Sequence, residues 1–318
     1  MFIGGARGQC KPLLHLYRAE TTIKLKNNMQ NRVLKRVTAM EEEFDSFGPQ
    51  DLIPEWENGD FCLSVGAEES SVPAQSHVVV YSDPTSAGAD RFRLAHMRLK
   101  NLQATRNLKS LIVTSPLPGD GKTTVVLNLA TVLSENGKVP VLLLEADVYR
   151  PVILERLNLK PWAGLSDCFR RNEDPMLAIR RINPLGFYLL PAGSPVELGG
   201  EVLQSQMVMQ FIKGLASSAF GWILIDSPPT TPAAEILTLK SLADGTLLVA
   251  RAGKTPREAI EESIQHLGRD HIFGMILNGI EGLEHTYYKY YKYGKSKTPA
   301  KPPKPTGVEG IGLNERAK

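Results

Sequence analysis

The stretch "SLIVTSPLPGDGKTTVVLNLA", residues 110–130, decides the fold class of this chain. Its first six residues predict a buried strand, and "GKTTVVLNLATVLSENG" predicts a helix that ends at Gly137. A glycine-rich turn between a strand and a helix N-terminus favours phosphate, because backbone N–H groups and the helix dipole converge there. The stretch therefore predicts a strand, a phosphate-binding loop and a helix of the P-loop type.

The loop residues point to a nucleotide with its metal ion. Lys122 is expected to reach the β- and γ-phosphates, and the Thr123 hydroxyl to bind Mg²⁺. Pro116 stands where the usual G-x-x-x-x-G-K-[ST] pattern has its first glycine, but the strand–loop–helix context is retained. We predict ATP and Mg²⁺ as cofactors. The predicted loop contacts are Gly119, Asp120, Gly121, Lys122, Thr123 and Thr124.

Strands and helices alternate along the rest of this region. All-apolar strands separated by helices predict an α/β fold with a mostly parallel sheet covered on both faces. Together with the phosphate-binding loop, this order of elements resembles the P-loop NTPase architecture of the Min/Par type. The predicted strands are 110–115, 139–147, 186–193, 221–229, 245–253 and 272–279, and the predicted helices are 90–102, 121–137, 199–218, 232–243 and 255–268.

Acidic residues follow two of these strands where a metal site is expected. In "VLLLEADVYRP", the predicted strand ends with Glu145 and Asp147, whose i, i+2 spacing points both side chains to one face. In "WILIDSPP", the predicted strand ends with Asp226. Mg²⁺ prefers carboxylate oxygens, so Asp147 and Asp226 are predicted to join Thr123 as ligands. The alternative is that these acids stand at strand ends only because they meet solvent there.

The charge pattern divides the chain into four segments. Residues 1–40 hold eight Lys/Arg and one acid. They are predicted to form a basic extension, or else translation starts at Met40 and they are not part of the protein. Residues 41–88 are predicted to be a flexible linker, since 41–83 carry eleven acids and no Lys/Arg. The predicted catalytic domain is 89–284, and 285–318 form a basic tail.

Composition narrows the class of protein. The three cysteines are scattered, which favours a reducing compartment, and no run of about 18 apolar residues is present to span a membrane. We therefore predict a cytoplasmic protein. Residues 84–284 are nearly balanced, with 21 basic and 20 acidic side chains, which argues against nucleic acid as a partner.

Five of the nine tyrosines stand together in "HTYYKYYKYGK", residues 285–295. No strand or helix buries adjacent residues on one face, so an exposed segment is predicted. Such a segment suits anion binding, nucleic-acid binding or modification. The tyrosines concerned are Tyr287, Tyr288, Tyr290, Tyr291 and Tyr293.

Taken together and in order, these motifs resemble the bacterial tyrosine kinases (BY-kinases), the CpsD/CapB-like autokinases of capsule and exopolysaccharide synthesis. The resemblance covers about residues 88–293 and includes "GLSDCF", "LLPAG" and "VARAGKTPREAI". It implies an ATP-dependent protein-tyrosine kinase that phosphorylates its own tyrosine cluster.

The resemblance also implies catalytic roles. Lys122 and Thr123 would hold phosphates and Mg²⁺, and Asp147 (Walker A′) and Asp226 (Walker B) would complete the metal site. Glu145 stands where the family has an aspartate thought to accept the tyrosine proton. Asn278 stands where related ATPases contact adenine, although a strand-end asparagine bonded to backbone is an alternative.

Partners are likewise implied by the resemblance. We expect a separate membrane-embedded activator of the chain-length-regulator type, which would place the chain peripherally at the inner membrane face, and a tyrosine phosphatase. A homo-oligomer is expected because Asp90, Arg93 and His96 match a Glu-x-x-Arg-x-x-Arg pattern that joins BY-kinase subunits, with His replacing the second Arg.

Two other functions remain open at this stage. A Min/Par-type ATPase without kinase activity shares the fold, but its signature lysine, five residues before Lys122, is Leu117 here. A nucleic-acid-binding protein is the other, carried by the basic helix 91–109 and the Tyr/Lys tail.

Overall fold

The computed structural model describes residues 55–57, 60–62, 65–231 and 235–280. All of these belong to one compact unit, Leu52–Lys318. The predicted basic extension 1–40 and the tyrosine cluster lie outside the described residues. Within the described part of the chain, no helix is both long enough and apolar enough to cross a lipid bilayer.

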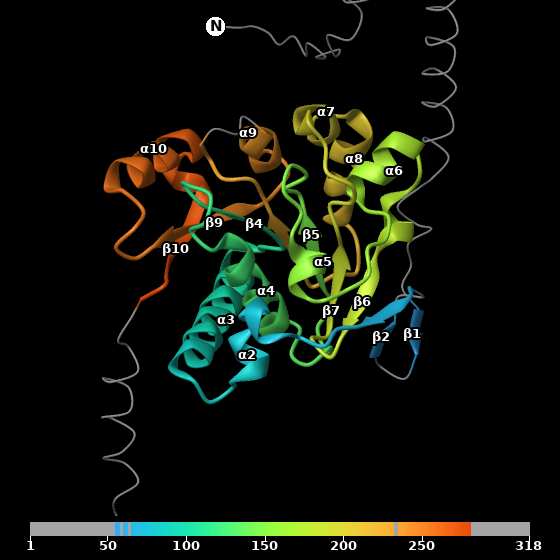
Figure 1. The fold of residues 1–318 in the computed structure, drawn as a ribbon, viewed down its shortest axis with the longest axis horizontal. Coiled ribbons are helices and arrows are strands. Elements are labelled where there is room, and N and C mark those ends of the chain that lie inside the picture. The colour runs from blue at the N-terminus through green and yellow to red at the C-terminus, as the bar shows by residue number, and fades with distance from the viewer. Residues whose placement is uncertain (1–54, 58–59, 63–64, 232–234, 281–318) are drawn as a thin grey trace, which may run out of the picture. The chain divides into compact units, whose positions relative to one another are not determined.

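A twisted sheet of eight strands forms the centre of the described region (Figure 1). Neighbouring strands are parallel except for β6 and β7, which pair antiparallel. The order across the sheet is β10-β9-β4-β8-β5-β7-β6-β3. The strands are β3 (Ala67–Glu69), β4 (Ser110–Thr114), β5 (Val141–Glu145), β6 (Arg180–Asn183), β7 (Phe187–Leu190), β8 (Trp222–Asp226), β9 (Gly245–Arg251) and β10 (Ile272–Asn278). A short hairpin, β1 (Glu55–Glu57) and β2 (Asp60–Cys62), stands apart from this sheet.

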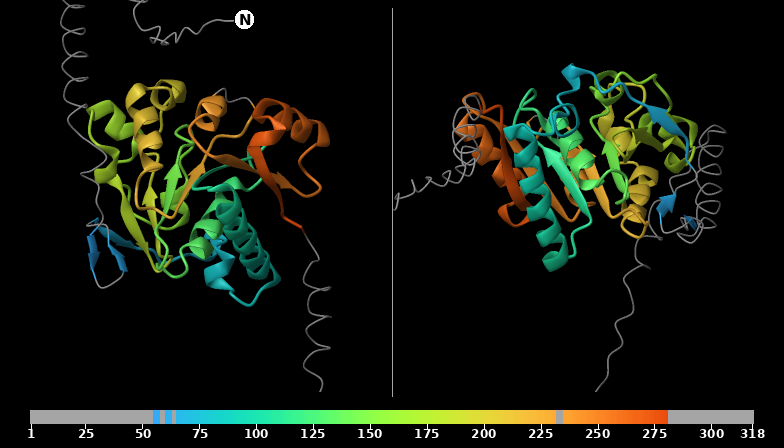
Figure 2. Two further views of the ribbon diagram at one scale, coloured as in Figure 1. Left: turned by 180° about the vertical axis from the view of Figure 1, so that it is seen from behind. Right: turned by 90° about the horizontal axis from the view of Figure 1, so that it is seen from below.

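Helices cover both faces of the sheet, which confirms the predicted fold class. Figures 1 and 2 show α2 (Val79–Ser82), α3 (Ala87–Arg106) and α4 (Lys122–Leu133) on one face. The opposite face carries α6 (Leu165–Arg171), α7 (Gly199–Leu203), α8 (Gln206–Leu215), α9 (Glu235–Lys240) and α10 (Arg257–Leu267). Each face has its own hydrophobic core. The central strands β4, β5 and β8 are buried along their full length, as their apolar sequences predict.

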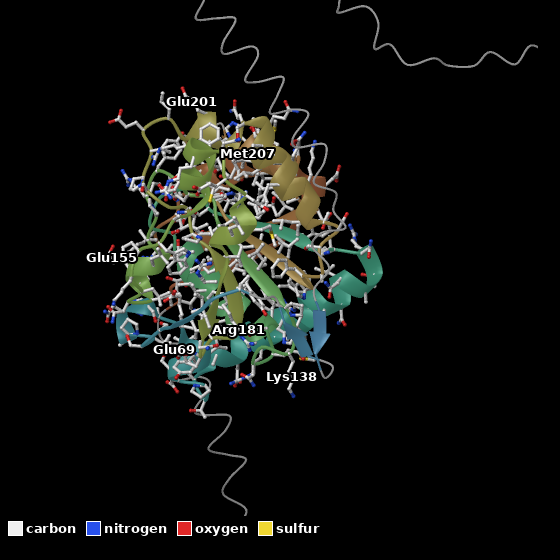
Figure 3. All side chains as sticks on the ribbon, turned by 90° about the vertical axis from the view of Figure 1, so that its right-hand side faces the viewer. Glu69, Lys138, Glu155, Arg181, Glu201 and Met207 are labelled. Atoms are coloured by element: carbon white, nitrogen blue, oxygen red, sulfur yellow. The ribbon has the colours of Figure 1, made fainter. Side chains whose placement is uncertain are left out.

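The predicted helix 199–218 is two helices rather than one. The chain breaks at Gln204 and Ser205, and the Ser205 side chain accepts a hydrogen bond from the Val208 backbone N–H. This N-cap starts a new helix axis. In Figure 3, Glu201 on α7 and Met207 on α8 lie near each other, at the opposite end of the view from Arg181 on β6.

Strand β3 and helix α2 lie inside the predicted linker 41–88, so that prediction is wrong for residues 67–82. β3 lies inside that segment and pairs with β6. "HVVVY", residues 77–81, docks on the core through helix α2 and a fully buried Val78, and adds no strand. The Asn128 side chain on α4 fixes this segment, since it accepts from Val80 N–H and donates to the His77 carbonyl. Acid-rich β3 has no apolar alternation to reveal it.

Helix α3 confirms the predicted helix 90–102 and extends it at both ends. Asp90 and Arg93 form an ion pair with each other at 2.6 Å. His96 lies 3.3 Å from Glu135, beyond the end of α4, and so contacts its own fold. The predicted role of these three residues in joining subunits stays a prediction.

Candidate nucleotide-binding and catalytic site

The phosphate loop connects the carboxyl end of β4 to the start of α4. Gly119 and Gly121 have φ values of +86° and +97°. Side chains rarely tolerate this left-handed region, so glycine is required at both positions. Helix α4 then begins at Lys122, with its first backbone N–H groups unpaired within the helix and directed at the loop.

Two predicted acids, Asp147 after β5 and Asp226 at the end of β8, meet the first residues of helix α4 at this loop. The Lys122 Nζ lies 3.0 Å from an Asp147 carboxylate oxygen, and both side chains are largely buried. The Thr123 side chain lies beside the Asp226 carboxylate at the end of β8 and opposes the rise in the pKa of that carboxyl. Parallel strands bring their carboxyl ends to one edge of the sheet, which is why residues 25 and 103 positions apart in sequence converge here.

Asp226 is buried with part of its hydrogen-bonding capacity unused. Its side chain is 1% exposed, and its Oδ1 has no hydrogen-bond partner among the described residues. Burial raises the pKa of this carboxyl to about 7, against the opposing effects of Lys122 and Thr123. An orphaned buried oxygen needs an explanation, and a bound cation supplies one.

The donors at this point fit Mg²⁺. They are hard oxygens from Thr123, Asp147 and Asp226, the chemistry that Mg²⁺ prefers. No cluster of three or more acidic, histidine or cysteine side chains suited to a metal occurs in the part of the chain that the structure describes. Mg²⁺ in nucleotide sites normally takes one or two carboxylates together with phosphate oxygens and water, so this set is sufficient with a nucleotide.

Glu145 lies beside Asp226 but points elsewhere. Its Oε1 accepts from the Val152 and Ile153 backbone N–H groups at 2.7 and 2.9 Å, and its Oε2 accepts from Ala192 N–H at 3.1 Å. The side chain is 1% exposed, and burial raises the pKa of this carboxyl. Both oxygens thus anchor main chain, and the predicted role of Glu145 as proton acceptor stays a prediction.

One cavity of about 1460 Å³ opens over the loop. It is lined by most of the predicted site residues, namely Gly119, Gly121, Lys122, Thr123, Thr124, Asp147 and Asn278. The side chains of Asp120 and Glu145, although predicted for the site, are directed into the protein. The Asn278 amide donates to the Asp120 carbonyl at 3.0 Å, the backbone-bonded arrangement that the sequence left open.

Several cavity residues were not predicted from the sequence. Arg156, at the end of α5 (Ile153–Arg156), donates to the Thr124 hydroxyl at 2.9 Å. Tyr149 donates its hydroxyl to Glu235, and burial with this hydrogen bond raises the pKa of Tyr149 to about 12. Tyr149 stands two residues after Asp147, so its position next to a predicted site residue could have placed it in the site. No motif in the sequence around Arg156 or Glu235 indicates that either residue lines the cavity.

The comparisons with known proteins agree with this geometry. The sequence model of a family described as "ParA: NUBPL iron-transfer P-loop NTPase" matches residues 107–280, more than half of the chain. The "Tyrosine-protein kinase YwqD" of Bacillus subtilis is 29% identical over 207 residues, which cover 64% of this chain and 86% of the relative. The chain belongs to the ParA family of P-loop NTPases, and it is similar to the bacterial tyrosine kinases.

Other relatives are longer than this chain or have been solved as kinase domains. The "Succinoglycan biosynthesis transport protein ExoP" of Rhizobium meliloti is 27% identical over 67% of this chain, but the match spans only 28% of that protein. The solved VpsO kinase domain is 26% identical with a TM-score of 0.53, over 61% of this chain and all of that one. The solved BceF tyrosine kinase domain is 25% identical with a TM-score of 0.58, over 69% and 93%.

Proposed function

We propose that this protein uses ATP and Mg²⁺ to phosphorylate tyrosines of its own C-terminal cluster. The observation that carries the proposal is the convergence of Lys122, Thr123, Asp147 and Asp226 at the phosphate loop, with an orphaned Asp226 oxygen. Kinase relatives and the five clustered tyrosines support the choice of acceptor.

The chain's own residues supply positioning and charge. Lys122 faces the expected β- and γ-phosphates, while the first N–H groups of α4 bind phosphate oxygens. Asp147 and Asp226, with Thr123, would hold Mg²⁺, which supplies charge neutralisation during phosphoryl transfer. The bond from the γ-phosphorus to ADP breaks as a bond to the tyrosine oxygen forms, and the phenolic proton leaves to a nearby base. Glu145 was predicted for that base.

Phosphorylation changes the sign of the tail's charge. Residues 285–318 carry eight basic and two acidic side chains, a net charge of +6. Five phosphates add roughly −8 to −10. We propose that the unmodified tail docks at a neighbouring subunit's acidic metal-binding cleft and is released once phosphorylated, in a homo-oligomer. Equal oligomer size for the dephosphorylated and fully phosphorylated protein would contradict this.

The biological setting is proposed from the relatives. The ExoP relative is named for succinoglycan biosynthesis and transport, so we propose a role in exopolysaccharide or capsule synthesis and export. A membrane-embedded activator of the chain-length-regulator type and an opposing tyrosine phosphatase complete this proposal. Through such an activator, the protein would act at the inner face of the membrane.

Mass spectrometry of the 285–295 peptide after addition of Mg²⁺ and ATP tests the function. The full chain is incubated alone and with candidate activator tails, with Lys122→Ala as the inactive control. Phosphotyrosine in the wild type and none in the control is expected. ATP turnover without phosphotyrosine, even with the cognate activator, would favour an ATPase of the Min/Par type.

A mixing experiment separates transfer between subunits from transfer within one. Lys122→Ala protein keeps its tyrosines, and a variant with Phe at all five cluster positions keeps its site. If transfer occurs between subunits, the mixture phosphorylates the Lys122→Ala chain. Absence of phosphate on that chain, when wild-type protein is phosphorylated in parallel, would restrict the reaction to a single subunit.

A further inference from the structure

Four side chains brace the backbone of the phosphate loop, and two of them, Arg251 and Asn278, also line the cavity. We name Asp120, Arg251, Thr255 and Asn278 the loop brace. Arg251, the last residue of β9, and Thr255, in the turn between β9 and α10, belong to "VARAGKTPREAI", a stretch that the proposed mechanism does not use. Asn278 ends β10. Three elements that follow the loop by more than 120 residues thus converge on it.

Asp120 is the centre of the loop brace. Its Oδ1 accepts from the Thr255 hydroxyl at 2.7 Å, and its Oδ2 accepts from the Leu117 backbone N–H at 3.0 Å. The residue is only 4% exposed. Its carboxylate therefore closes the turn on itself and ties the turn to the β9–α10 segment.

The other members fix the remaining loop backbone. The Arg251 backbone N–H donates to the Thr255 hydroxyl at 2.7 Å, which orients that hydroxyl toward Asp120. The Arg251 guanidinium donates to the Gly119 carbonyl at 3.1 Å, and the Asn278 amide donates to the Asp120 carbonyl at 3.0 Å. Two successive loop carbonyls are thus held by side chains at the ends of β9 and β10.

The loop needs such support because its conformation is costly alone. Gly119 and Gly121 are left-handed, and glycine loses more backbone entropy on ordering than any other residue. An acid next to a phosphate site also repels the ligand. A buried carboxylate in this turn is explained if ordering of the loop favours nucleotide binding more than charge repulsion opposes it.

We infer that the loop brace pre-forms the phosphate loop and sets nucleotide affinity, with Thr255 and Asp120 as positioning residues. The inference rests on the proposed nucleotide binding at this site. Pre-organisation lowers the ordering cost of binding, so the loss falls on affinity and not on the rate at saturating ATP.

The first test is Thr255→Val in the full chain, with Mg²⁺-ADP binding measured by calorimetry. Loss of the hydroxyl bond to a carboxylate is expected to weaken binding roughly tenfold or more. The KM for ATP rises accordingly, and kcat stays close to that of the wild type. Thr255→Ser keeps the hydroxyl and is expected to restore affinity.

Thr246→Val is the matched control. Thr246 on β9 is fully buried, and its hydroxyl has no hydrogen-bond partner within the described part of the chain, so its loss is expected to leave nucleotide affinity unchanged. Thermal melts without nucleotide verify that each variant folds. Thr255→Val binding Mg²⁺-ADP like the wild type would overturn the inference, and so would failure of Thr255→Ser to restore binding.

Asp120→Ala tests the inference through the direction in which nucleotide affinity changes. Electrostatics alone predicts tighter nucleotide binding when this negative charge is removed, whereas the loop brace predicts weaker binding. Tighter binding would overturn the inference. Wild-type protein that binds no nucleotide would refute the proposed function together with the loop brace, whereas normal wild-type binding with unaffected Thr255→Val refutes the loop brace alone.

Discussion

Glu145 and Asp226 end adjacent strands and are direct partners in the β5–β8 register. Both are 1% exposed. Glu145 accepts three backbone hydrogen bonds, whereas Asp226 keeps an oxygen with no partner among the residues that the structure describes. The same position at the sheet edge thus holds one acid that anchors loops and one acid with a buried oxygen that no described residue satisfies.

The difference comes from the loops after the two strands. After β5 the chain turns back so that Val152 and Ile153 present their N–H groups to Glu145, and Ala192 after β7 supplies a third. After β8, the charged form of Asp226 is favoured by the nearby Lys122 and by the Thr123 hydroxyl, both from the phosphate loop and α4. A buried carboxylate with few donors is expensive unless a cation binds it.

Asp226→Asn is expected to have the largest effect. It removes the charge that we propose holds Mg²⁺, so tyrosine phosphorylation at saturating ATP should fall by roughly 100-fold or more. Quantitative mass spectrometry of the 285–295 peptide measures it. Glu262→Gln, an exposed acid on α10, serves as the control and should phosphorylate normally. Wild-type rates in Asp226→Asn would refute the metal assignment.

The second prediction concerns how the stability of the metal-free protein depends on pH. Because the pKa of Asp226 rises from 3.8 to about 7 on folding, the folded state holds this proton more tightly than the unfolded chain. Stability is therefore full below about pH 4 and declines as pH rises toward 7, by at most about 4 kcal/mol.

Thermal melts in a chelator between pH 5 and 8 check this prediction. The melting temperature of the wild type should fall with rising pH, and Asp226→Asn should flatten that part of the curve. Parallel curves for the two proteins would show that Asp226 titrates normally and that the comparison with Glu145 is wrong.

Glu145→Gln is expected to affect stability more than chemistry. Its amide nitrogen cannot accept from Ala192 N–H, so the free energy of unfolding should fall by roughly 1–3 kcal/mol. Denaturant titration measures this loss. The phosphorylation rate should fall far less than in Asp226→Asn. A stably folded Glu145→Gln protein as inactive as Asp226→Asn would instead support the proton-acceptor role.

Tyr149→Phe is expected to have the smallest effect. The Tyr149 hydroxyl ties the loop anchored by Glu145 to α9 through Glu235. Its loss should lower the free energy of unfolding by roughly 1 kcal/mol, less than Glu145→Gln. Tyr81→Phe on α2 is the control, since Tyr81 is 47% exposed and should change stability little. A larger loss than Glu145→Gln would make Tyr149 the main anchor.

Local patterns were enough to predict the sheet and the phosphate loop. The buried strands β4, β5 and β8 follow from unbroken apolar runs, and the loop follows from glycines before a helix. The edge strand β3 and its neighbour β6 were missed because "AEE" and "RRIN" have no apolar run. Pairing with a neighbour, not local composition, makes them strands.

By itself, the sequence determined the fold class, the loop and the acids at the strand ends, because each depends on residues close together in the chain. Only the tertiary structure decided which acid is satisfied, where Asp120 points and which side chains support the loop. Hydrogen bonds between residues 47, 135 and 158 positions apart contribute to each of those outcomes. Partners at such separations leave no periodic or local signal, so packing alone assigns them.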